Sequence, residues 1–158
     1  MNESEFKESL SKLSAGVSII ATRCQGKLFG FTASSLVSVS LAPPLVSFCL
    51  NKDATSFDAF ARSDVFSASI LAENQVELSR HFARHIDDKF LKVDYQIGAN
   101  GCPLIENAIC LLECKKVQEF SAGDHIIFIG EVKSTKINND SSPLIYYARN
   151  YRHLKLND

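Results

Sequence analysis

Two long runs of apolar and β-branched residues, joined by a short polar turn, constrain the fold of this chain more than any other feature. The runs are Ile109–Phe120 and His125–Ile137, and Ser121-Ala122-Gly123-Asp124 lies between them. β-Branched and aromatic residues favour strands, and glycine tolerates the backbone angles of a tight turn. The sequence therefore predicts two long strands joined as a hairpin.

Shorter elements precede and follow this hairpin. Apolar runs bounded by turn residues predict strands at Val17–Thr22, Leu28–Thr32, Val37–Leu41, Leu45–Leu50, Val65–Leu71 and Leu144–Tyr147. Helical spacing predicts three short helices at 5–13, 56–62 and 75–84, with starting caps at Asn2, Thr55 and Asn74. We expect Pro43 and Pro44 to end the pairing between their flanking strands. We expect residues 85–103 to form a short helix or turn followed by loop.

The order of these elements indicates the fold class. Strands are not regularly alternated with crossover helices, so a doubly wound fold is disfavoured. A chain of 158 residues matches one domain that needs neither disulfides nor a structural metal. We therefore predict a mostly β protein with short helices, folded as a single domain around a closed or partly closed antiparallel barrel.

Composition and charge exclude several classes of protein. Seventeen basic and eighteen acidic residues give a formal net charge of −1, with no basic run that could follow a phosphate backbone. We expect no nucleic-acid partner. Glu3, Glu5 and Glu8 stand where a secretory signal needs basic residues, and no apolar stretch reaches the ~20 residues that span a bilayer. We expect no membrane contact and a cytoplasmic location.

Cysteines and histidines do not form a convincing metal site. The five cysteines are an odd number without a CxxC pair, which favours reduced and mostly buried thiols. His81 and His85 have the spacing of a zinc pair, but Phe82 stands where an HExxH motif has its glutamate. We expect no metal and interpret this pair as solvated histidines at a helix end.

The segment Phe29–Pro44, read as FGFTASSLVSVSLAPP, has the composition of a binding site. Small residues let a backbone approach a flat ligand, and hydroxyl and N–H groups can bond polar ring edges or a phosphate. GxGxxG, GxxxxGK[ST] and GxSxG motifs are absent, so neither a Rossmann dehydrogenase, an NTPase nor a serine hydrolase is indicated. The serines could alternatively be turn residues that cap a strand end.

Several motifs taken in order resemble the short-chain flavin reductase family. They are Phe6-x3-Leu10-x5-Gly16-Val17-x-Ile19, the segment Phe29–Pro44, Leu45–Asn51, Gly101-Cys102-Pro103-Leu104, Gly123-Asp124-His125 and Phe128-Ile129-Gly130-Glu131-Val132. The resemblance covers nearly the whole chain. It implies a flavin reductase-like domain over residues 1–158, with the fold of an FMN-binding split β-barrel. It further implies a homodimer with flavin in a groove near the subunit interface.

The activity that this resemblance implies is hydride transfer from NADH or NADPH to FMN or FAD. Such enzymes often supply reduced flavin to a separate monooxygenase component. On the matched positions, the flavin ring and ribityl chain would be lined by Thr32, Ala33, Ser34 and Ser35. The ring edge would meet backbone groups of Cys49, Leu50 and Asn51. The phosphate would face Ser56 and Phe57. Lys89 would add a positive charge, its alternative being a solvated surface lysine. His125 would meet the nicotinamide as the catalytic residue, its alternative being a hairpin-end histidine.

The sequence is also compatible with other functions. The tail Tyr146-Tyr147-Ala148-Arg149-Asn150-Tyr151 departs from the family's YFRGRY-like pattern at Ala148 and Arg149, which concerns the nicotinamide contacts more than the flavin site. A flavin-binding electron-transfer protein on the same barrel, without fast NAD(P)H turnover, is one alternative. A non-flavin interaction domain, with a purely structural serine segment, is another. The sequence does not separate FMN from FAD or NADH from NADPH.

Overall fold

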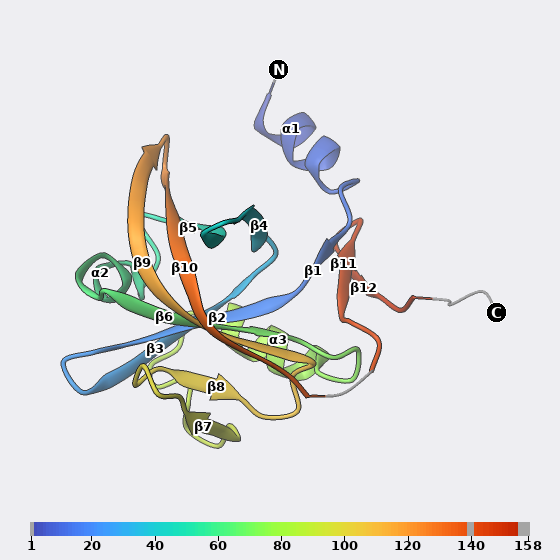
Figure 1. The fold of residues 1–158 in the computed structure, drawn as a ribbon. Helices are drawn as coiled ribbons and strands as arrows, with labels where there is room; N and C mark the ends of the chain where they lie inside the picture. The colour runs from blue at the N-terminus through green and yellow to red at the C-terminus, as the bar shows by residue number, and fades with distance from the viewer. Residues whose placement is uncertain (1, 139–140, 155–158) are drawn as a thin grey trace.

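The structure is a computed structural model that describes residues 2–138 and 141–154. Its centre is one antiparallel seven-stranded sheet with the order β3-β2-β6-β9-β10-β5-β4 (Figure 1). The strands are β2 (Ser18–Cys24), β3 (Lys27–Ala33), β4 (Val37–Leu41), β5 (Pro44–Asn51), β6 (Val65–Ile70), β9 (Cys110–Ala122) and β10 (His125–Ile137). The predicted strands of the central sheet are therefore confirmed.

The β9–β10 hairpin is staggered between its two neighbours. β6 pairs with β9 from Cys110 to Lys115, whereas β5 pairs with β10 from His125 to Glu131. Over the described residues, the later part of each long strand is paired only with the other long strand. Gly123 forms the turn at φ +62°, which glycine adopts without steric cost.

Side chains from near the two ends of the sheet pack together inside the barrel, although hydrogen bonds do not close it. β3 and β4 are the two ends of the sheet order and are not neighbours in it. Phe31 on β3 packs against Phe48 on β5, with 5.8 Å between ring centroids, and against Phe60 at 5.4 Å. The sheet is therefore a partly closed barrel, as the sequence predicted.

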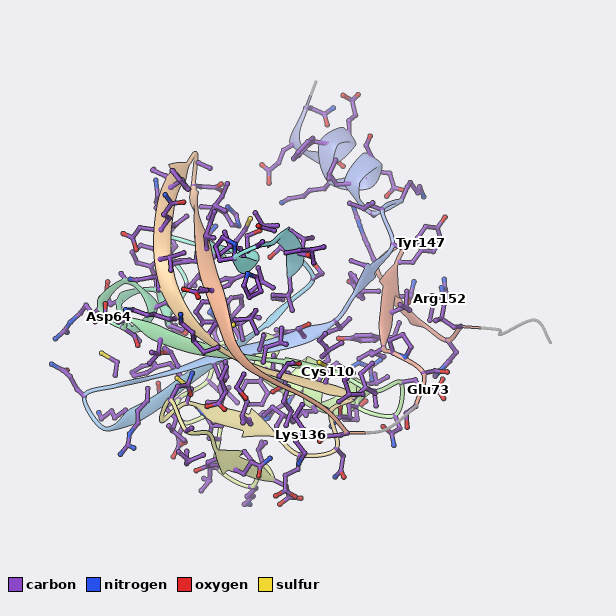
Figure 2. All side chains as sticks on the ribbon, viewed as in Figure 1. Asp64, Glu73, Cys110, Lys136, Tyr147 and Arg152 are labelled. Carbon is purple, nitrogen blue, oxygen red and sulfur yellow. The ribbon has the colours of Figure 1, made fainter. Side chains whose placement is uncertain are left out.

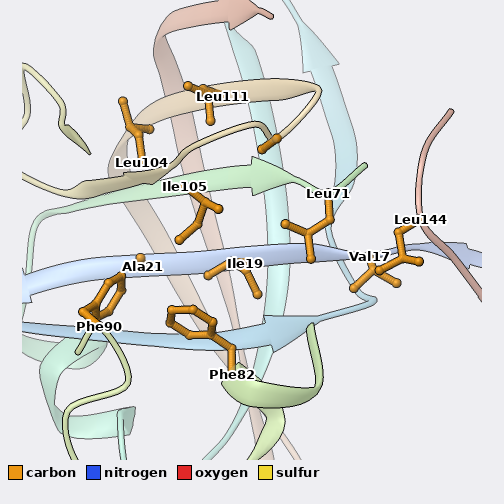
Figure 3. Packing of buried hydrophobic residues seen from close by; sticks show 11 residues of the cluster. Val17, Ile19, Ala21, Leu71, Phe82, Phe90, Leu104, Ile105, Leu111 and Leu144 are labelled. Atoms are coloured by element: carbon orange, nitrogen blue, oxygen red, sulfur yellow. The ribbon is translucent and has the colours of Figure 1, made fainter. Parts of the chain in front are cut away.

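β2, which lies next to the edge strand β3, faces two cores. Successive residues of a strand point to opposite faces, so Ile19 and Ala21 join one apolar cluster and Ile20 the other. Figure 3 shows the first cluster, in which Phe82 and Phe90 pack under β2. The second cluster is the aromatic interior of the barrel and includes Phe48, Phe60, Phe66 and Phe128.

Three short helices accompany the sheet: α1 (Glu3–Leu10), α2 (Phe57–Arg62) and α3 (Val76–Ala83). The predicted capping box of Asn2 and Glu5 is confirmed. The caps predicted at Thr55 and Asn74 are wrong, because the N-cap residues are Ser56 and Gln75 and neither side chain caps its helix. α1 buries no residue, so its apolar side chains are not part of the core.

Some short strands escaped the sequence analysis. Within the stretch expected to be loop, β7 (Tyr95–Ile97) pairs with β8 (Pro103–Ile105). A separate sheet contains β11 (Ile145–Tyr147), which confirms the strand predicted at Leu144–Tyr147, and two strands that were not predicted, β1 (Ala15–Gly16) and β12 (Asn150–Arg152). Figure 2 labels Tyr147 and Arg152 on its β11–β12 hairpin. The strands that were not predicted have two or three residues each, too few for a periodic signal.

The backbone ties this small sheet to the core. The Val17 N–H donates to Leu144 O at 3.0 Å, and the Leu144 N–H donates to Leu71 O at 2.9 Å. Leu144 itself is fully buried. The pairing between β4 and β5 ends at the prolines as expected, although Pro44 itself is still paired with Leu41 as the first residue of β5.

Cys102 and Cys114 are buried, and the other three cysteines are partly exposed, so the expectation of mostly buried thiols is only partly met. All five are free thiols. Burial raises the pKa of Cys114 to about 12. Among the described residues there is no group of three or more potential metal ligands. No described helix is long and apolar enough to cross a membrane.

Candidate functional site

One groove at the ends of β3 and β5 gathers almost all the residues that the sequence singled out. It has a volume of about 400 Å³. The predicted residues that line it are Thr32, Ala33, Ser34, Ser35, Cys49, Leu50, Asn51, Ser56, Lys89 and His125. Phe57 does not line it. Residues from 32 to 125 thus meet at one place although they belong to five different segments.

Strand pairing and one side-chain bond position the floor of the groove. In the β5–β10 ladder, Asn51 lies opposite His125. The Cys49 N–H donates to Ser35 Oγ at 3.0 Å, which ties the segment after β3 to β5. The ends of β3, β5 and β10 are therefore held together by the fold itself.

The four residues Thr32 to Ser35 contribute in different ways. The Thr32 hydroxyl donates to Ser79 O at 2.6 Å, so its proton is committed to α3. Ala33 is buried in the aromatic interior, and Ser35 is bonded to β5. Ser34 is exposed, and its hydroxyl makes no hydrogen bond to any described residue. Ser34 is therefore the hydroxyl that is free for a ligand.

Basic side chains line the groove. Arg84 and Lys89 carry its positive charge, the imidazoles of His85 and His125 lie beside them, and no described carboxylate lines it. Cationic side chains and exposed hydroxyls suit a phosphate group. Sequence reasoning missed Arg84 and His85; their position directly after an amphipathic helix, next to the Asp88-Lys89-Phe90 segment, was the available signal.

Lys89 is a wall residue and not a solvated surface lysine. Its Nζ donates to Phe82 O at 2.8 Å, and burial lowers its pKa. His81 Nε2 donates to Lys89 O at 2.7 Å. These two bonds fasten the segment around Lys89 to the C-terminal end of α3. His81 is thus engaged with the backbone, not directed at His85 as a metal pair.

His125 is oriented by its neighbour. Its Nδ1 lies 2.7 Å from Asp124 Oδ1, and this hydrogen bond lowers the pKa of Asp124. With Nδ1–H donating to the carboxylate, Nε2 remains available on a side chain that is 41% exposed. The imidazole can therefore meet a polar group of a ligand in the groove.

The structure does not support the expected role of Phe57. Its side chain packs against the aromatic interior, and its N–H donates to Ala54 O at 2.9 Å. This bond belongs to the turn that opens α2, so the N–H group has a partner within the chain. Ser56, in contrast, lines the groove, and Thr55 beside it also does.

The fold and the groove define a small, mostly β protein: a partly closed antiparallel barrel with small and basic side chains around a hollow at its strand ends. The model of the family "Flavin reductase like domain" matches residues 10–155, and the chain belongs to this family. The family resemblance seen in the sequence is therefore confirmed.

Named relatives match most of the length of the chain. A flavin reductase from Pseudomonas putida is 33% identical, with 92% of this chain and 86% of that protein covered. The actinorhodin polyketide dimerase of Streptomyces coelicolor is 35% identical over 94% of this chain and 85% of its own length. A solved structure from Streptomyces globisporus, an NADH:FAD oxidoreductase in complex with NAD and FAD fragments, is similar to this protein. The two superpose with a TM-score of 0.94 at 32% sequence identity, and the match covers 98% of this chain and 93% of that chain.

Proposed function

We propose that the protein is an NAD(P)H:flavin oxidoreductase that transfers a hydride from NADH or NADPH to FMN or FAD. Relatives named as reductase subunits of flavin-dependent monooxygenases support its role as the component that supplies reduced flavin to a separate monooxygenase. The observation that carries the proposal is the groove, in which small residues, a free hydroxyl and cationic side chains meet. The whole of residues 1–158 would act as this one domain.

The residues of the groove fit a flavin nucleotide. Thr32, Ala33, Ser34 and Ser35 form a wall of small residues that a flat ring can approach closely. Cys49, Leu50 and Asn51 would offer backbone groups to the polar ring edge. The phosphate would be held by charge-assisted hydrogen bonds from Ser56, Lys89 and Arg84, the last of which the sequence did not indicate.

The protein's part in the reaction is binding and orientation. Flavin and nicotinamide supply the hydride chemistry when they are bound. His125, held by Asp124, would orient the nicotinamide amide against the flavin ring. Proximity of the reacting rings, at roughly 3–3.5 Å, would then account for much of the rate.

The test is flavin-dependent oxidation of NADH and NADPH, followed by the near-ultraviolet absorbance of the reduced nicotinamide. Oxidation that requires added or bound flavin is expected. His125→Ala should lower NAD(P)H turnover more than flavin affinity, whereas His153→Ala, at an exposed histidine outside the groove, should change neither. If the protein binds flavin but oxidises neither NADH nor NADPH with either FMN or FAD, an electron-transfer protein would be indicated instead. Failure to bind flavin would point to an interaction domain.

We also propose that the protein is a homodimer and works in the cytoplasm, where its five free thiols would stay reduced. Two apolar patches support the dimer: Phe6, Leu10 and Leu13 at α1, and Val37, Val39 and Leu41 on β4, all of them exposed. Leu41 is 89% exposed, and surfaces of this kind mark contacts between proteins. Sedimentation should show two copies, and Val39→Asp with Leu41→Asp should give monomers. A monomeric parent would refute the dimer.

A further inference from the structure

Ser79 connects three elements that are distant in the sequence. It lies on α3, and its carbonyl oxygen accepts the hydroxyl proton of Thr32 on β3 at 2.6 Å. Its own hydroxyl lies 2.9 Å from the hydroxyl of Tyr151 on β12, and either oxygen can be the donor of this hydrogen bond. Ser79 is fully buried, and neither Ser79 nor Tyr151 lines the groove. The groove residue Thr32 is therefore linked to the β11–β12 hairpin through one buried serine.

α3 and the residues directly after it build one part of the groove. Phe82 and Ala83 line the groove at the end of the helix, and Arg84 and His85, which follow them, also line it. Ser79 precedes Phe82 by three residues, which is less than one helical turn. A shift of the helix at Ser79 would therefore move the apolar and the basic residues of this part of the groove together.

Other contacts hold the two ends of α3. At its start, Gln75 Nε2 donates to Glu106 O at 2.9 Å. At its end, Lys89 Nζ donates to Phe82 O at 2.8 Å, and the Phe82 ring packs under β2 (Figure 3). The hydrogen bond from Ser79 to Tyr151 holds the middle of the helix between these two ends.

The hairpin that carries Tyr151 is itself held in place. β11 is paired with β1, and the Ala148 N–H at the turn of the hairpin donates to Ser11 O at 2.8 Å. The rings of Tyr151 and Tyr146 lie 5.3 Å apart, and Arg80 Cζ of α3 lies 5.4 Å from the centroid of the Tyr151 ring. These contacts fix the ring, so its hydroxyl is presented to Ser79 in one position.

We propose that Ser79 and Tyr151 are positioning residues for flavin binding. This inference rests on the proposed function, because a flavin must occupy the groove. Their hydrogen bond sets where α3 lies against β3, and so holds Thr32 and the basic side chains after α3 in one arrangement. Without the Tyr151 hydroxyl, the Ser79 hydroxyl is buried without a partner, and a movement of α3 relieves that cost. Side chains that bind a ligand lose affinity when the residues that support them move.

Flavin fluorescence titrations and steady-state kinetics of the full chain test this inference. Tyr151→Phe and Ser79→Ala should each raise the Kd for FMN and for FAD about threefold to tenfold, the effect of one lost hydrogen bond. The value of kcat at saturating flavin should change little, because neither residue touches the reacting rings. The double variant should bind flavin no more weakly than the weaker single variant, because both changes remove the same bond. Amide hydrogen exchange in α3 should be faster in Tyr151→Phe than in the parent.

Thr22→Val is the matched control. The Thr22 hydroxyl is fully buried, and it makes hydrogen bonds with Ser63 Oγ at 2.8 Å and Val65 O at 2.7 Å. Thr22 does not line the groove. The variant should lower the free energy of unfolding, as Tyr151→Phe does, but leave the Kd for flavin unchanged. If Thr22→Val raised this Kd as much as the other two variants, general destabilisation would explain the effect and the inference would be refuted.

Each remaining outcome also decides between the possible roles of this bond. If Tyr151→Phe lowered the free energy of unfolding but bound flavin like the parent, the bond would be structural alone, and the proposed function would stand without this inference. A raised KM for NADH at an unchanged Kd for flavin would assign Tyr151 to the nicotinamide and overturn its role through α3. If the parent bound neither FMN nor FAD, the proposed function would fall as well.

Discussion

The buried interior of the protein and the groove at the ends of its strands use the same residue type in opposite ways. In the interior, Ser67 Oγ donates to Pro103 O at 2.5 Å, and Ser69 Oγ accepts the Ile105 N–H at 3.0 Å. In the groove, Ser34 is exposed and its hydroxyl has no partner among the described residues. A hydroxyl that stabilises the fold has its partner within the chain, whereas a hydroxyl that serves a ligand is left without one.

The same contrast holds for the two regions as a whole. Among the described residues, every buried side-chain nitrogen and oxygen has a hydrogen-bond partner. Substitutions in the interior should therefore change the free energy of unfolding, and substitutions in the groove should change binding alone. The following predictions test this division in order of their expected effect on unfolding.

Phe48→Ala should have the largest effect. Phe48 is fully buried and contacts the rings of Phe31, Phe60, Phe66 and Phe128 with centroids 5.0–5.8 Å away. Truncation of a buried Phe costs about 3–5 kcal/mol through lost burial and the cavity left behind. Denaturant unfolding measures the change. Phe120→Ala, at a half-exposed ring, is the matched control and should cost far less; equal losses would contradict the division.

Because of Cys114, the free energy of unfolding should depend on pH. Its folded pKa is raised to about 12, whereas an unfolded thiol titrates near about 8.5. The stabilisation is therefore complete below about pH 8.5 and is lost as pH rises toward the folded pKa, by up to about 1.4 kcal/mol per pH unit. Denaturant titrations should show a shallower fall for Cys114→Ala than for the parent. Leu111→Ala, at a buried residue that does not titrate, should keep the parent's slope.

Arg149→Gly should stabilise the protein by a smaller amount. Ala148 and Arg149 form the turn between β11 and β12 with φ of +49° and +60°, a conformation in which a side chain is strained. Glycine removes that strain, worth roughly 1–2 kcal/mol, and gives back about 0.4–1 kcal/mol because the unfolded chain gains freedom, while the exposed contact of Arg149 with Glu8 contributes little. Thermal unfolding measures the gain. Gly123→Ala, at φ +62°, should show the opposite sign.

Ser34→Tyr should change unfolding least and binding most. The residue is exposed, so the free energy of unfolding should stay within about 0.5 kcal/mol of the parent. The ring of tyrosine would fill the groove and abolish flavin binding. Ser14→Tyr, at an exposed serine outside the groove, should bind flavin normally. A Ser34→Tyr variant that binds FMN like the parent would show that the flavin lies elsewhere.

The sequence was informative wherever a local pattern decides the structure. The long runs that became β9 and β10 and the Asn2 cap of α1 depend on neighbours in sequence, and both predictions are confirmed. β1, β7, β8 and β12 were not predicted, because strands of two or three residues are too short to show a period in the sequence. Caps at α2 and α3 failed because packing, not a capping side chain, fixes where these helices begin.

The groove could be predicted as a set of residues but not as a set of contacts. Motif order brought together residues from Thr32 to His125, which the fold does place around one hollow. The engagement of Phe57 N–H with Ala54 and of Lys89 Nζ with Phe82 follows from three-dimensional packing and left no trace in the motifs. The hydrogen bond between Ser79 and Tyr151 was missed for the same reason, since no motif marks a contact between two distant segments.

The place of Leu144 has a consequence for synthesis of the protein. Its backbone bridges Val17 and Leu71, and its side chain lies in the core formed largely by the preceding strands. A nascent chain on the ribosome can form the β2–β3 hairpin early, but it cannot finish this core until Leu144 has been added and has left the ribosome. Premature termination before Leu144 would therefore leave apolar surface uncovered and deliver the product to chaperones or proteases.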